Sequence, residues 1–324
     1  MSEIDHIKLP IKKEMDEFEK RFRNSLKSPV PLLDIITNYL LRRKGKQIRP
    51  LFVFLSAQAA GGVQESTYTA ATMIELMHTA TLIHDDVVDE SYERRGFFSI
   101  NALWKSKIAV LVGDYLLSKG LLISLENKQY EMLHTLSDAV KKMSEGELQQ
   151  MQSSRKTIID VDNYFDIINK KTASLIKACT LSGAQSATKD EKVLEALANY
   201  GELAGIAFQI KDDLFDYQEK GIIGKPVGND IKDKKFTLPL ILALKNSDQN
   251  EAKKIIKLVN NNHKNRETLK YITDFVKNNN GLTDANNIML NYKNKAISSL
   301  SVISDNEAKK SLIELVNYTV ERNK

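Results

Sequence analysis

The chain has 324 residues, of which 42% are hydrophobic and 27% are charged, and its formal net charge is +5 at pH 7. This composition is that of a globular protein with enough apolar residues for a sizeable core, so it excludes wholesale disorder. Lysines and arginines are scattered among acidic residues, which argues against a nucleic-acid-binding surface.

Cys179 is the only cysteine, so no intrachain disulfide can form, and its apolar helical surroundings indicate a core residue. The first residues show no signal-peptide pattern, and the longest apolar runs are too short to span a membrane. We therefore expect a cytoplasmic protein without a transmembrane segment.

Apolar residues recur at helical spacing along most of the chain. The pattern predicts helices over residues 11–26 (with Met15, Phe18 and Phe22 inward), 32–43, 51–60, 68–88, 101–125, 130–151 and 191–217. Gly113 and Gly120 indicate close packing of the 101–125 helix. Asp162 is expected to cap the helix after it, and Ser304 to open the last helix through a capping box with Glu307. No convincing strand, dinucleotide-binding fingerprint or Walker loop is present, so we predict an all-α helical bundle forming a single domain over residues 1–324.

Two acidic clusters stand at the polar ends of two predicted helices. The first contains Asp85, Asp86 and Asp89 and is followed by Arg94 and Arg95; the second contains Asp212, Asp213 and Asp216. The first and last carboxylates of each cluster share a helix face, where like charges repel. Mg²⁺ is typically held by one or two carboxylates together with substrate phosphates. The pair of clusters therefore predicts magnesium ions that draw off negative charge as a diphosphate leaves, although a single cluster could be a solvated acidic face.

Basic residues near the clusters predict anion binding. Lys46 and Arg49 lie at the start of the 51–60 helix, where backbone amides favour anions. Residues 218–236 form a glycine- and lysine-rich loop able to close over a phosphate. His78 lies two helical turns before Asp85 and shares its face. The alternative for Lys46 and Arg49 is a solvated basic loop, and that for residues 218–236 is a surface connection. The alternative for His78 is a buried core histidine.

With these motifs in order, the chain resembles the trans-isoprenyl diphosphate synthases, of the medium- to long-chain type (hexa-, hepta- or octaprenyl) that makes quinone side chains. The resemblance covers roughly residues 32–244. Its motifs are the Gly-Lys-x-x-Arg-Pro segment ending at Pro50, His78, the first acidic cluster with Arg94-Arg-Gly, Gly113-Asp, Lys171-Thr-Ala, Phe208-Gln with the second cluster, Gly224-Lys-Pro-Val-Gly-Asn-Asp and Thr237-Leu-Pro.

The resemblance implies an isoprenoid-synthase bundle with a central substrate cavity. Such an enzyme condenses isopentenyl diphosphate with an allylic diphosphate, using several Mg²⁺ ions, and is expected to be a homodimer, with loose membrane association for product release left open. The resemblance assigns Mg²⁺ binding to Asp85, Asp89, Asp212 and Asp216. It assigns binding of the allylic diphosphate to Arg94, Lys171, Thr172, Gln209, Lys225 and Lys235. Binding of isopentenyl diphosphate is assigned to Lys46, Arg49, His78 and Arg95. Asp86 and Asp213 complete the catalytic clusters, and no protein base is assigned.

The sequence departs from the family pattern at two lysines. Lys234 stands where a glycine is usual, which leaves open whether Lys234 or Lys235 contacts diphosphate. Lys211 replaces an apolar residue and either pairs with a carboxylate or faces solvent.

Product length is predicted from the helix that carries the first cluster. Thr81 and Met77 lie four and eight residues before Asp85 and line one face beneath it. Ala80 and Thr81 are small where short-chain members of the family carry an aromatic plug nearby. We therefore expect an all-trans product of six to eight isoprene units, with a farnesyl or geranylgeranyl diphosphate synthase as the alternative.

Three other functions compete with this one. A class I terpene cyclase shares the first cluster but normally carries an Asn-Ser-Glu-type second metal motif, which is absent. A non-catalytic partner subunit would lack the clusters, whereas the catalytic half of a heterodimer remains open. His84-Asp85 also matches the helical metal phosphohydrolases, which need more histidines upstream and give the second cluster no role.

Overall fold

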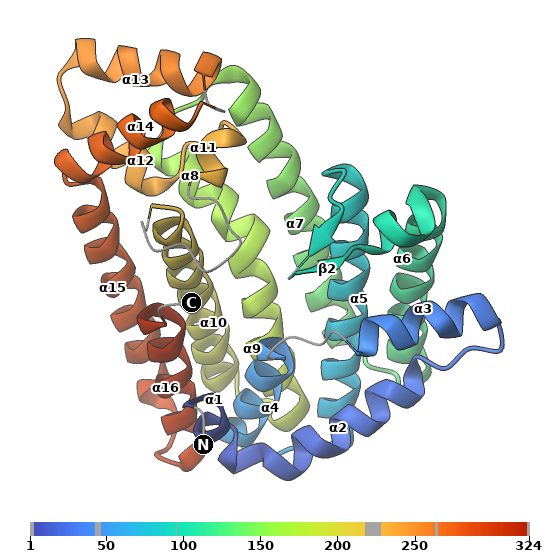
Figure 1. The fold of residues 1–324 in the computed structure, drawn as a ribbon. Helices are drawn as coiled ribbons and strands as arrows, with labels where there is room; N and C mark the ends of the chain where they lie inside the picture. Colours follow the sequence, from blue (N-terminus) through green and yellow to red (C-terminus); the bar gives the residue numbers. More distant parts are fainter. Residues whose placement is uncertain (1–2, 43–46, 95, 218–227, 263–264, 323–324) are drawn as a thin grey trace. The chain divides into compact units, whose positions relative to one another are not determined.

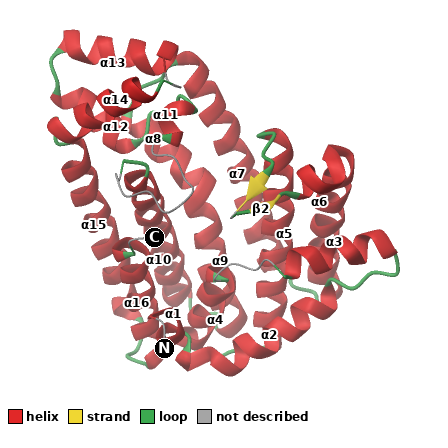
Figure 2. Cartoon of the chain, viewed as in Figure 1, coloured by secondary structure: helices red, strands yellow, loops and turns green. Residues whose placement is uncertain are grey.

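The structure, a computed structural model, describes residues 3–42, 47–94, 96–217, 228–262 and 265–322. These residues are almost entirely helical (Figures 1 and 2), which confirms the predicted all-α class. The extended segments in the described part are the two-residue strands β1 (Glu93–Arg94) and β2 (Phe97–Phe98), which pair antiparallel.

In chain order the helices are α1 (Glu3–Ile7), the 3-10 turn η1 (Leu9–Ile11), α2 (Lys12–Ser25), α3 (Pro31–Leu41), α4 (Ile48–Ala60), α5 (Glu65–Val88), α6 (Ile100–Glu126), α7 (Tyr130–Lys156), α8 (Val161–Ile168), the π-helical turn η2 (Asn169–Ala173), α9 (Ser174–Ala187), α10 (Glu191–Phe215), α11 (Asn229–Lys232), α12 (Leu238–Asn246), α13 (Gln249–Asn262), α14 (Arg266–Asn278), α15 (Gly281–Ser299), the 3-10 turn η3 (Leu300–Val302) and α16 (Glu307–Glu321).

The chain divides into two compact units, each assembled from three stretches. Unit 1 contains Met1–Val140, Ala178–Leu197 and Val302–Leu312, and unit 2 contains Lys141–Lys177, Ala198–Ser301 and Ile313–Lys324. Helices α7, α9, α10 and α16 contribute residues to both units. The single domain over residues 1–324 therefore stays a prediction.

Unit 1 confirms the predicted core faces of its helices. Phe18 and Phe22 on α2 are buried, and Phe18 meets Phe54 of α4 edge-on at 5.7 Å between ring centroids. Helix α6 lies beside α5 (Figure 1), and a Cβ atom at Gly113 would come within 2.2 Å of His84 Nε2. One at Gly120 would lie 3.1 Å from Met77 Cγ. Because only glycine fits at such distances, these residues allow the close packing expected of them.

Helix α6 is long and apolar enough to cross a membrane by length and composition, with a mean hydropathy of 1.7 over 18 residues. The sequence prediction missed this because lysines interrupt its apolar runs. A third of that window is buried in the protein, and packed helices of water-soluble proteins pass the same test, so the observation is weak support for a membrane span. Its outer face exposes Leu103, Leu111, Leu122 and Leu125.

Unit 2 holds a core beneath the second acidic cluster. Tyr164 and Ile168 of α8, Ile210 of α10, Leu238 of α12 and Met289 of α15 are buried together. Burial of such side chains typically contributes about 1.5–3 kcal/mol each, so the end of α10 is firmly anchored.

Two predicted helix caps are wrong. Asp160, not Asp162, caps α8, since its Oδ2 accepts a hydrogen bond from the Asn163 amide at 2.9 Å. Asn306, not Ser304, caps α16, since its Oδ1 accepts from the Lys309 amide at 2.8 Å. Each helix begins where a side-chain oxygen reaches the amide three residues on, and neighbouring Asp, Asn and Ser residues compete for that position.

Candidate active site

Each acidic cluster lies at the C-terminal end of a long helix. Asp85 and Asp86 are in the last turn of α5, and Asp89 follows that helix, its amide donating to the Asp85 carbonyl at 2.8 Å. Asp212 and Asp213 occupy the last turn of α10 in the same way, with Asp216 just beyond it. The C-terminal end of a helix carries partial negative charge, so carboxylates there are unfavourable and a cation there is stabilising. Both clusters are thus placed where a cation would bind.

The first cluster, in unit 1, separates into accessible and buried carboxylates. Asp85 is half-buried and Asp89 is exposed, whereas Asp86 is only 4% exposed. The Asp86 carbonyl accepts hydrogen bonds from the Ser91 amide and from Asn101 Nδ2, which fixes the turn after α5. The accessible pair, Asp85 and Asp89, is the pair to which the resemblance assigns metal.

The residues assigned to isopentenyl diphosphate are described in part. Arg49 lies in the first turn of α4 and His78 is buried on α5, both in unit 1. Lys46 and Arg95 lie outside the described residues, as do Lys225 and the side chain of Arg94.

Cys179, in unit 1, is completely buried, as predicted. Burial raises the pKa of the thiol to about 12, opposed by the charge of Arg49. The thiol therefore stays protonated at neutral pH, in agreement with a core role.

The residues predicted to set product length lie on α5. Met77 and Ala80 are buried, and Met77 faces Gly120 of α6. Thr81 is half-buried and donates to the His78 carbonyl at 2.9 Å.

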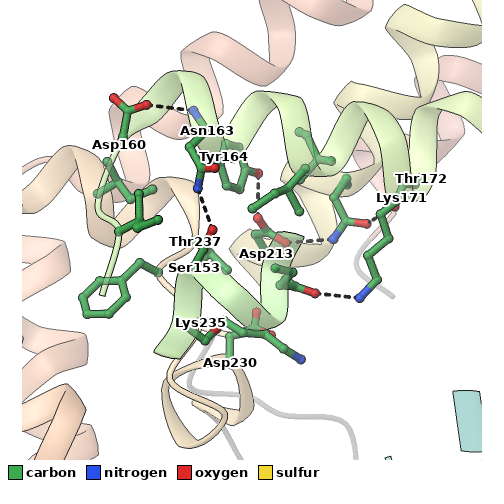
Figure 3. Close-up of a pocket in the computed structure, with 18 residues that line it drawn as sticks. Ser153, Asp160, Asn163, Tyr164, Lys171, Thr172, Asp213, Asp230, Lys235 and Thr237 are labelled. Carbon is green, nitrogen blue, oxygen red and sulfur yellow. Dashed lines mark hydrogen bonds between the residues drawn. The ribbon is translucent and has the colours of Figure 1, made fainter. Parts of the chain in front are cut away.

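Unit 2 contains a pocket of about 120 Å³ that brings together residues distant in the sequence (Figure 3). Its polar lining includes Lys171, Thr172, Gln209, Asp213, Asp230 and Lys235. Four of these, Lys171, Thr172, Gln209 and Lys235, are among the residues assigned to the allylic diphosphate. Lys235 lines the pocket and Lys234 does not, which favours Lys235 as the residue that contacts diphosphate, and this contact stays a prediction.

A hydrogen-bonded chain connects the pocket side chains (Figure 3). Thr172 Oγ1 donates to Gln209 Oε1 at 2.7 Å, and Gln209 Nε2 donates to Asp213 Oδ1 at 2.9 Å. The Tyr164 hydroxyl donates to the other oxygen of Asp213 at 2.6 Å. Burial raises the pKa of Asp213 to about 8, helped by the charge of Asp230. Asp213 is thus a buried residue that orients Gln209 and Thr172.

Lys171 and its neighbour Lys170 belong to the π-helical turn η2 but have different partners. Lys171 Nζ lies 2.7 Å from Gln150 Oε1 and 2.5 Å from Glu147 Oε2. Lys170 Nζ instead contacts Gln149 and Asp166. Single π-turns often occur at functional sites.

Two glycines allow α7 and α10 to pack closely against this π-turn. A Cβ atom at Gly205 of α10 would lie 2.6 Å from Ala173 Cα, and one at Gly146 of α7 would lie 2.9 Å from Lys170 Cβ and 3.0 Å from the Lys171 amide nitrogen. Any larger residue would have to push η2 away, and Lys171 with it.

We predict that Gly205→Ala lowers the free energy of unfolding by about 1–3 kcal/mol, the usual range for overpacking. In an exposed helix interior the same change would stabilise by about 1 kcal/mol, so the sign tests the contact. Urea unfolding measures the change. Activity assayed well below the melting temperature should also fall. A stabilised, fully active variant would contradict the close packing of Gly205 against the π-turn.

Asp216 orders the segment that follows it. Its two carboxylate oxygens accept hydrogen bonds from the amides of Asn229, at 2.9 Å, and Asp230, at 3.0 Å. Burial raises the pKa of Asp216, partly offset by these amides. Burial, with the charge of Asp216, also raises the pKa of Asp230 to about 6. Each Asp216 oxygen keeps a second lone pair with which it can bind a metal ion. The role of Asp216 as a metal ligand stays a prediction.

Lys234 adopts the backbone conformation for which glycine is suited. Its φ is +56°, and it ends α11 in a Schellman motif: the Lys234 amide donates to the Ile231 carbonyl at 3.0 Å and the Lys235 amide to the Asp230 carbonyl at 2.8 Å. This turn places Lys235 beside Asp230 in the pocket, which explains why glycine is usual at this position.

Lys234→Gly should therefore raise the free energy of unfolding by about 0.5–1 kcal/mol, since glycine adopts a positive φ without strain. Lys232→Gly, two residues earlier within α11, removes the same charge and should lower it by about 1 kcal/mol. Chemical denaturation of both variants measures the difference. Equal effects would show that the backbone conformation of Lys234 has no energetic cost.

Lys211 is partly exposed and also contacts an aromatic ring. Its ammonium lies over the Phe215 ring, 5.0 Å from the centroid, and burial together with the charge of Arg322 lowers its pKa. The neighbouring carboxylate, Asp212, is instead paired with Arg322.

The sequence prediction missed several site residues. Tyr164, Gln150 and Arg322 carry no motif, and only the fold brings them to the pocket or the second cluster. Asp230 stands within the Gly224 motif but was not assigned a role.

Oxygen donors and cations of the described residues fit a metal–diphosphate complex. No group of three His, Cys, Asp or Glu side chains in the described ranges could enclose a metal alone. Mg²⁺ does not need one, because it is commonly held by one or two carboxylates, substrate phosphates and water. In unit 1, Asp85 and Asp89 supply partly exposed carboxylates. In unit 2, Asp212 supplies another, and Lys171 and Lys235 supply positive charge for a diphosphate.

Comparison with known proteins identifies the family of the chain. The polyprenyl synthetase family model matches residues 30–276. An octaprenyl diphosphate synthase of Haemophilus influenzae is 32% identical over 99% of this chain and 97% of its own length. A short chain isoprenyl diphosphate synthase of Methanothermobacter thermautotrophicus is 31% identical over 96% and 97%, respectively. The crystal structure of a Caulobacter crescentus polyprenyl synthase complexed with calcium and isoprenyl diphosphate is 30% identical, with a TM-score of 0.90 and coverage of 99% of this chain and 98% of that one. The chain therefore belongs to the polyprenyl synthetase family of prenyltransferases.

Proposed function

We propose that this prenyltransferase condenses isopentenyl diphosphate with an allylic diphosphate and releases an all-trans polyprenyl diphosphate of six to eight isoprene units, for a quinone side chain. The observation that carries the proposal is the unit 2 pocket, where Lys171, Thr172, Gln209 and Lys235 come together. These side chains provide two cations and two neutral hydrogen-bonding groups, a combination suited to a diphosphate.

The residues of the chain have distinct roles in this proposal. Lys171 and Lys235 bind the diphosphate, and Asp213 holds Gln209 and Thr172 in place through their hydrogen bonds. Asp233 and Asp230 near Lys235 raise its pKa despite its burial, which keeps it charged. Asp85, Asp89, Asp212 and Asp216 would hold Mg²⁺, which when bound neutralises charge on the departing diphosphate.

The deciding experiment incubates the purified chain alone with Mg²⁺, farnesyl diphosphate and isotopically labelled isopentenyl diphosphate. We expect polyprenyl diphosphates of six to eight units by chromatography of the extracted product. A product that stops at farnesyl or geranylgeranyl diphosphate would refute the proposed length. Absence of any condensation product would refute the proposal for the chain alone, and activity restored by a partner would identify the catalytic half of a heterodimer.

Sequence identity does not decide product length, because relatives named for octaprenyl and for short chain products are almost equally similar. The proposal therefore depends on α5. Ala80 is buried five residues before Asp85, and a small residue there leaves room for a growing chain.

We predict that Ala80→Phe shortens the main product by two or more isoprene units, because the ring fills the space available to the prenyl tail. Thr79→Phe is the matched control, since it adds the same ring to an adjacent, half-buried position on another side of α5. Product analysis under identical conditions compares the two. Unchanged length in Ala80→Phe would place the tail elsewhere.

We further propose that the chain is a cytoplasmic homodimer. Support comes from α6, where Leu111, Leu122 and Leu125 are exposed at helical spacing. Light scattering in detergent-free buffer should give twice the chain mass of 36.7 kDa. A monomer that binds lipid vesicles would instead assign this face to a membrane surface.

A further inference from the structure

Arg322 lies directly after α16 and reaches the second acidic cluster, 110 residues away in sequence. Its guanidinium forms an ion pair with Asp212 through Oδ1 of the carboxylate. The Arg322 side chain is only 15% exposed, while that of Asp212 is 41% exposed. This pair therefore covers one side of a carboxylate that is still partly exposed to solvent.

The Arg322 guanidinium also contacts two aromatic rings and a backbone carbonyl. Its central carbon lies 4.4 Å from the Phe208 ring centroid and 5.4 Å from that of Phe215, and Nε donates to the Thr319 carbonyl at 3.1 Å. Phe208 and Phe215 flank Asp212 by one helical turn on either side of α10. A planar guanidinium can stack flat on aromatic rings while its fork donates hydrogen bonds, whereas the lysine ammonium is a point charge. These contacts therefore favour arginine over lysine at this position.

Arg322 also lies where negative electrostatic potential favours a cation. Asp212 lies in the last turn of α10, where the helix dipole adds negative potential to that of the neighbouring carboxylates. A cation is favourable there, and in this structure the guanidinium supplies it. A metal ion on the same carboxylate would meet the positive charge of Arg322 within a few ångströms.

We propose that Arg322 is the internal counter-ion of the second acidic cluster: it neutralises Asp212 in the metal-free enzyme and is displaced when Mg²⁺ binds. The inference rests on the proposed role of Asp212 as a metal ligand. Its consequence is that Arg322 weakens metal binding in the absence of diphosphate. Metal would then load efficiently only when it arrives with a diphosphate, whose negative charge also offers Arg322 a new partner.

The test measures Mn²⁺ binding to the full chain by electron paramagnetic resonance, without substrate. Arg322→Gln should bind Mn²⁺ about tenfold more tightly, equivalent to about 1.4 kcal/mol, since the metal ion no longer has to displace a charge-assisted hydrogen bond. Arg322→Lys keeps the charge but loses the stacked fork, so its affinity should lie between the two. Arg266→Gln, an exposed arginine at the start of α14, removes the same charge elsewhere and should leave Mn²⁺ affinity unchanged.

A second readout is thermal unfolding of the same proteins. Without metal, Arg322→Gln should melt below the unchanged chain because Asp212 loses its counter-ion, and saturating Mn²⁺ should remove that difference. Asp212→Asn separates the inference from the proposal beneath it. If Asp212→Asn loses Mn²⁺ while Arg322→Gln binds it equally or more weakly, the counter-ion inference is wrong and the metal site stands. If Asp212→Asn binds Mn²⁺ normally, the proposed metal role of Asp212 fails, and the role of Arg322 fails with it.

Discussion

Replacing Asp85 or Asp212 by Ala should reduce kcat by about a hundred- to a thousandfold, the usual cost of removing one group that stabilises developing charge. Each substitution removes a carboxylate predicted to hold Mg²⁺ on the allylic diphosphate. Steady-state kinetics at saturating Mg²⁺ and both substrates measure the effect. Asp162→Asn, at an exposed position of α8 in unit 2, removes one negative charge away from the clusters and is the control.

Stability should distinguish catalytic loss from misfolding in these variants. Metal-free Asp85→Ala should stay folded, since Asp85 lies at the C-terminal end of α5, where the helix dipole disfavours negative charge. Asp212→Ala loses its ion pair with Arg322 and should be slightly less stable. Normal product formation by Asp85→Ala would contradict the prenyl-transfer mechanism proposed for the first cluster.

Lys171→Met should lower kcat/KM by about a hundredfold, because a charge-assisted contact to phosphate contributes about 1.5–3 kcal/mol. The Lys171 side chain lines the pocket from the π-turn η2, and methionine keeps most of its length without the charge. Initial rates at limiting allylic diphosphate measure the loss.

Lys170→Met offers a control one residue away on the same turn. The Lys170 ammonium forms its ion pair with Asp166, whose side chain is 48% exposed, and exposed pairs contribute at most about 1 kcal/mol. Its kcat/KM should therefore stay near that of the unchanged chain. Equal losses in both variants would mean that the turn as a whole, and not the Lys171 charge, determines binding.

Local sequence patterns determined much of this protein. The buried stripe of α2 and the glycines of α6 follow from spacing, because a helix face repeats every three to four residues. The same rule places Asp85 and Asp89 together at the end of α5, and Asp212 at the end of α10. Oxygen-ligand chemistry then predicts a hard cation at each end.

The tertiary structure decided which side chains complete the second cluster and its pocket. Tyr164 meets Asp213 across 49 residues, and Arg322 meets Asp212 across 110. Such partners are chosen by how helices pack, and no periodicity within one helix encodes them. Backbone conformation is decided in the same way: Lys234 takes a positive φ because the Schellman hydrogen bonds at the end of α11 require it, although lysine alone would avoid it. The sequence by itself therefore determined the helices and the chemistry of the acidic clusters, whereas packing between distant segments selected the residues that orient and neutralise the second of them.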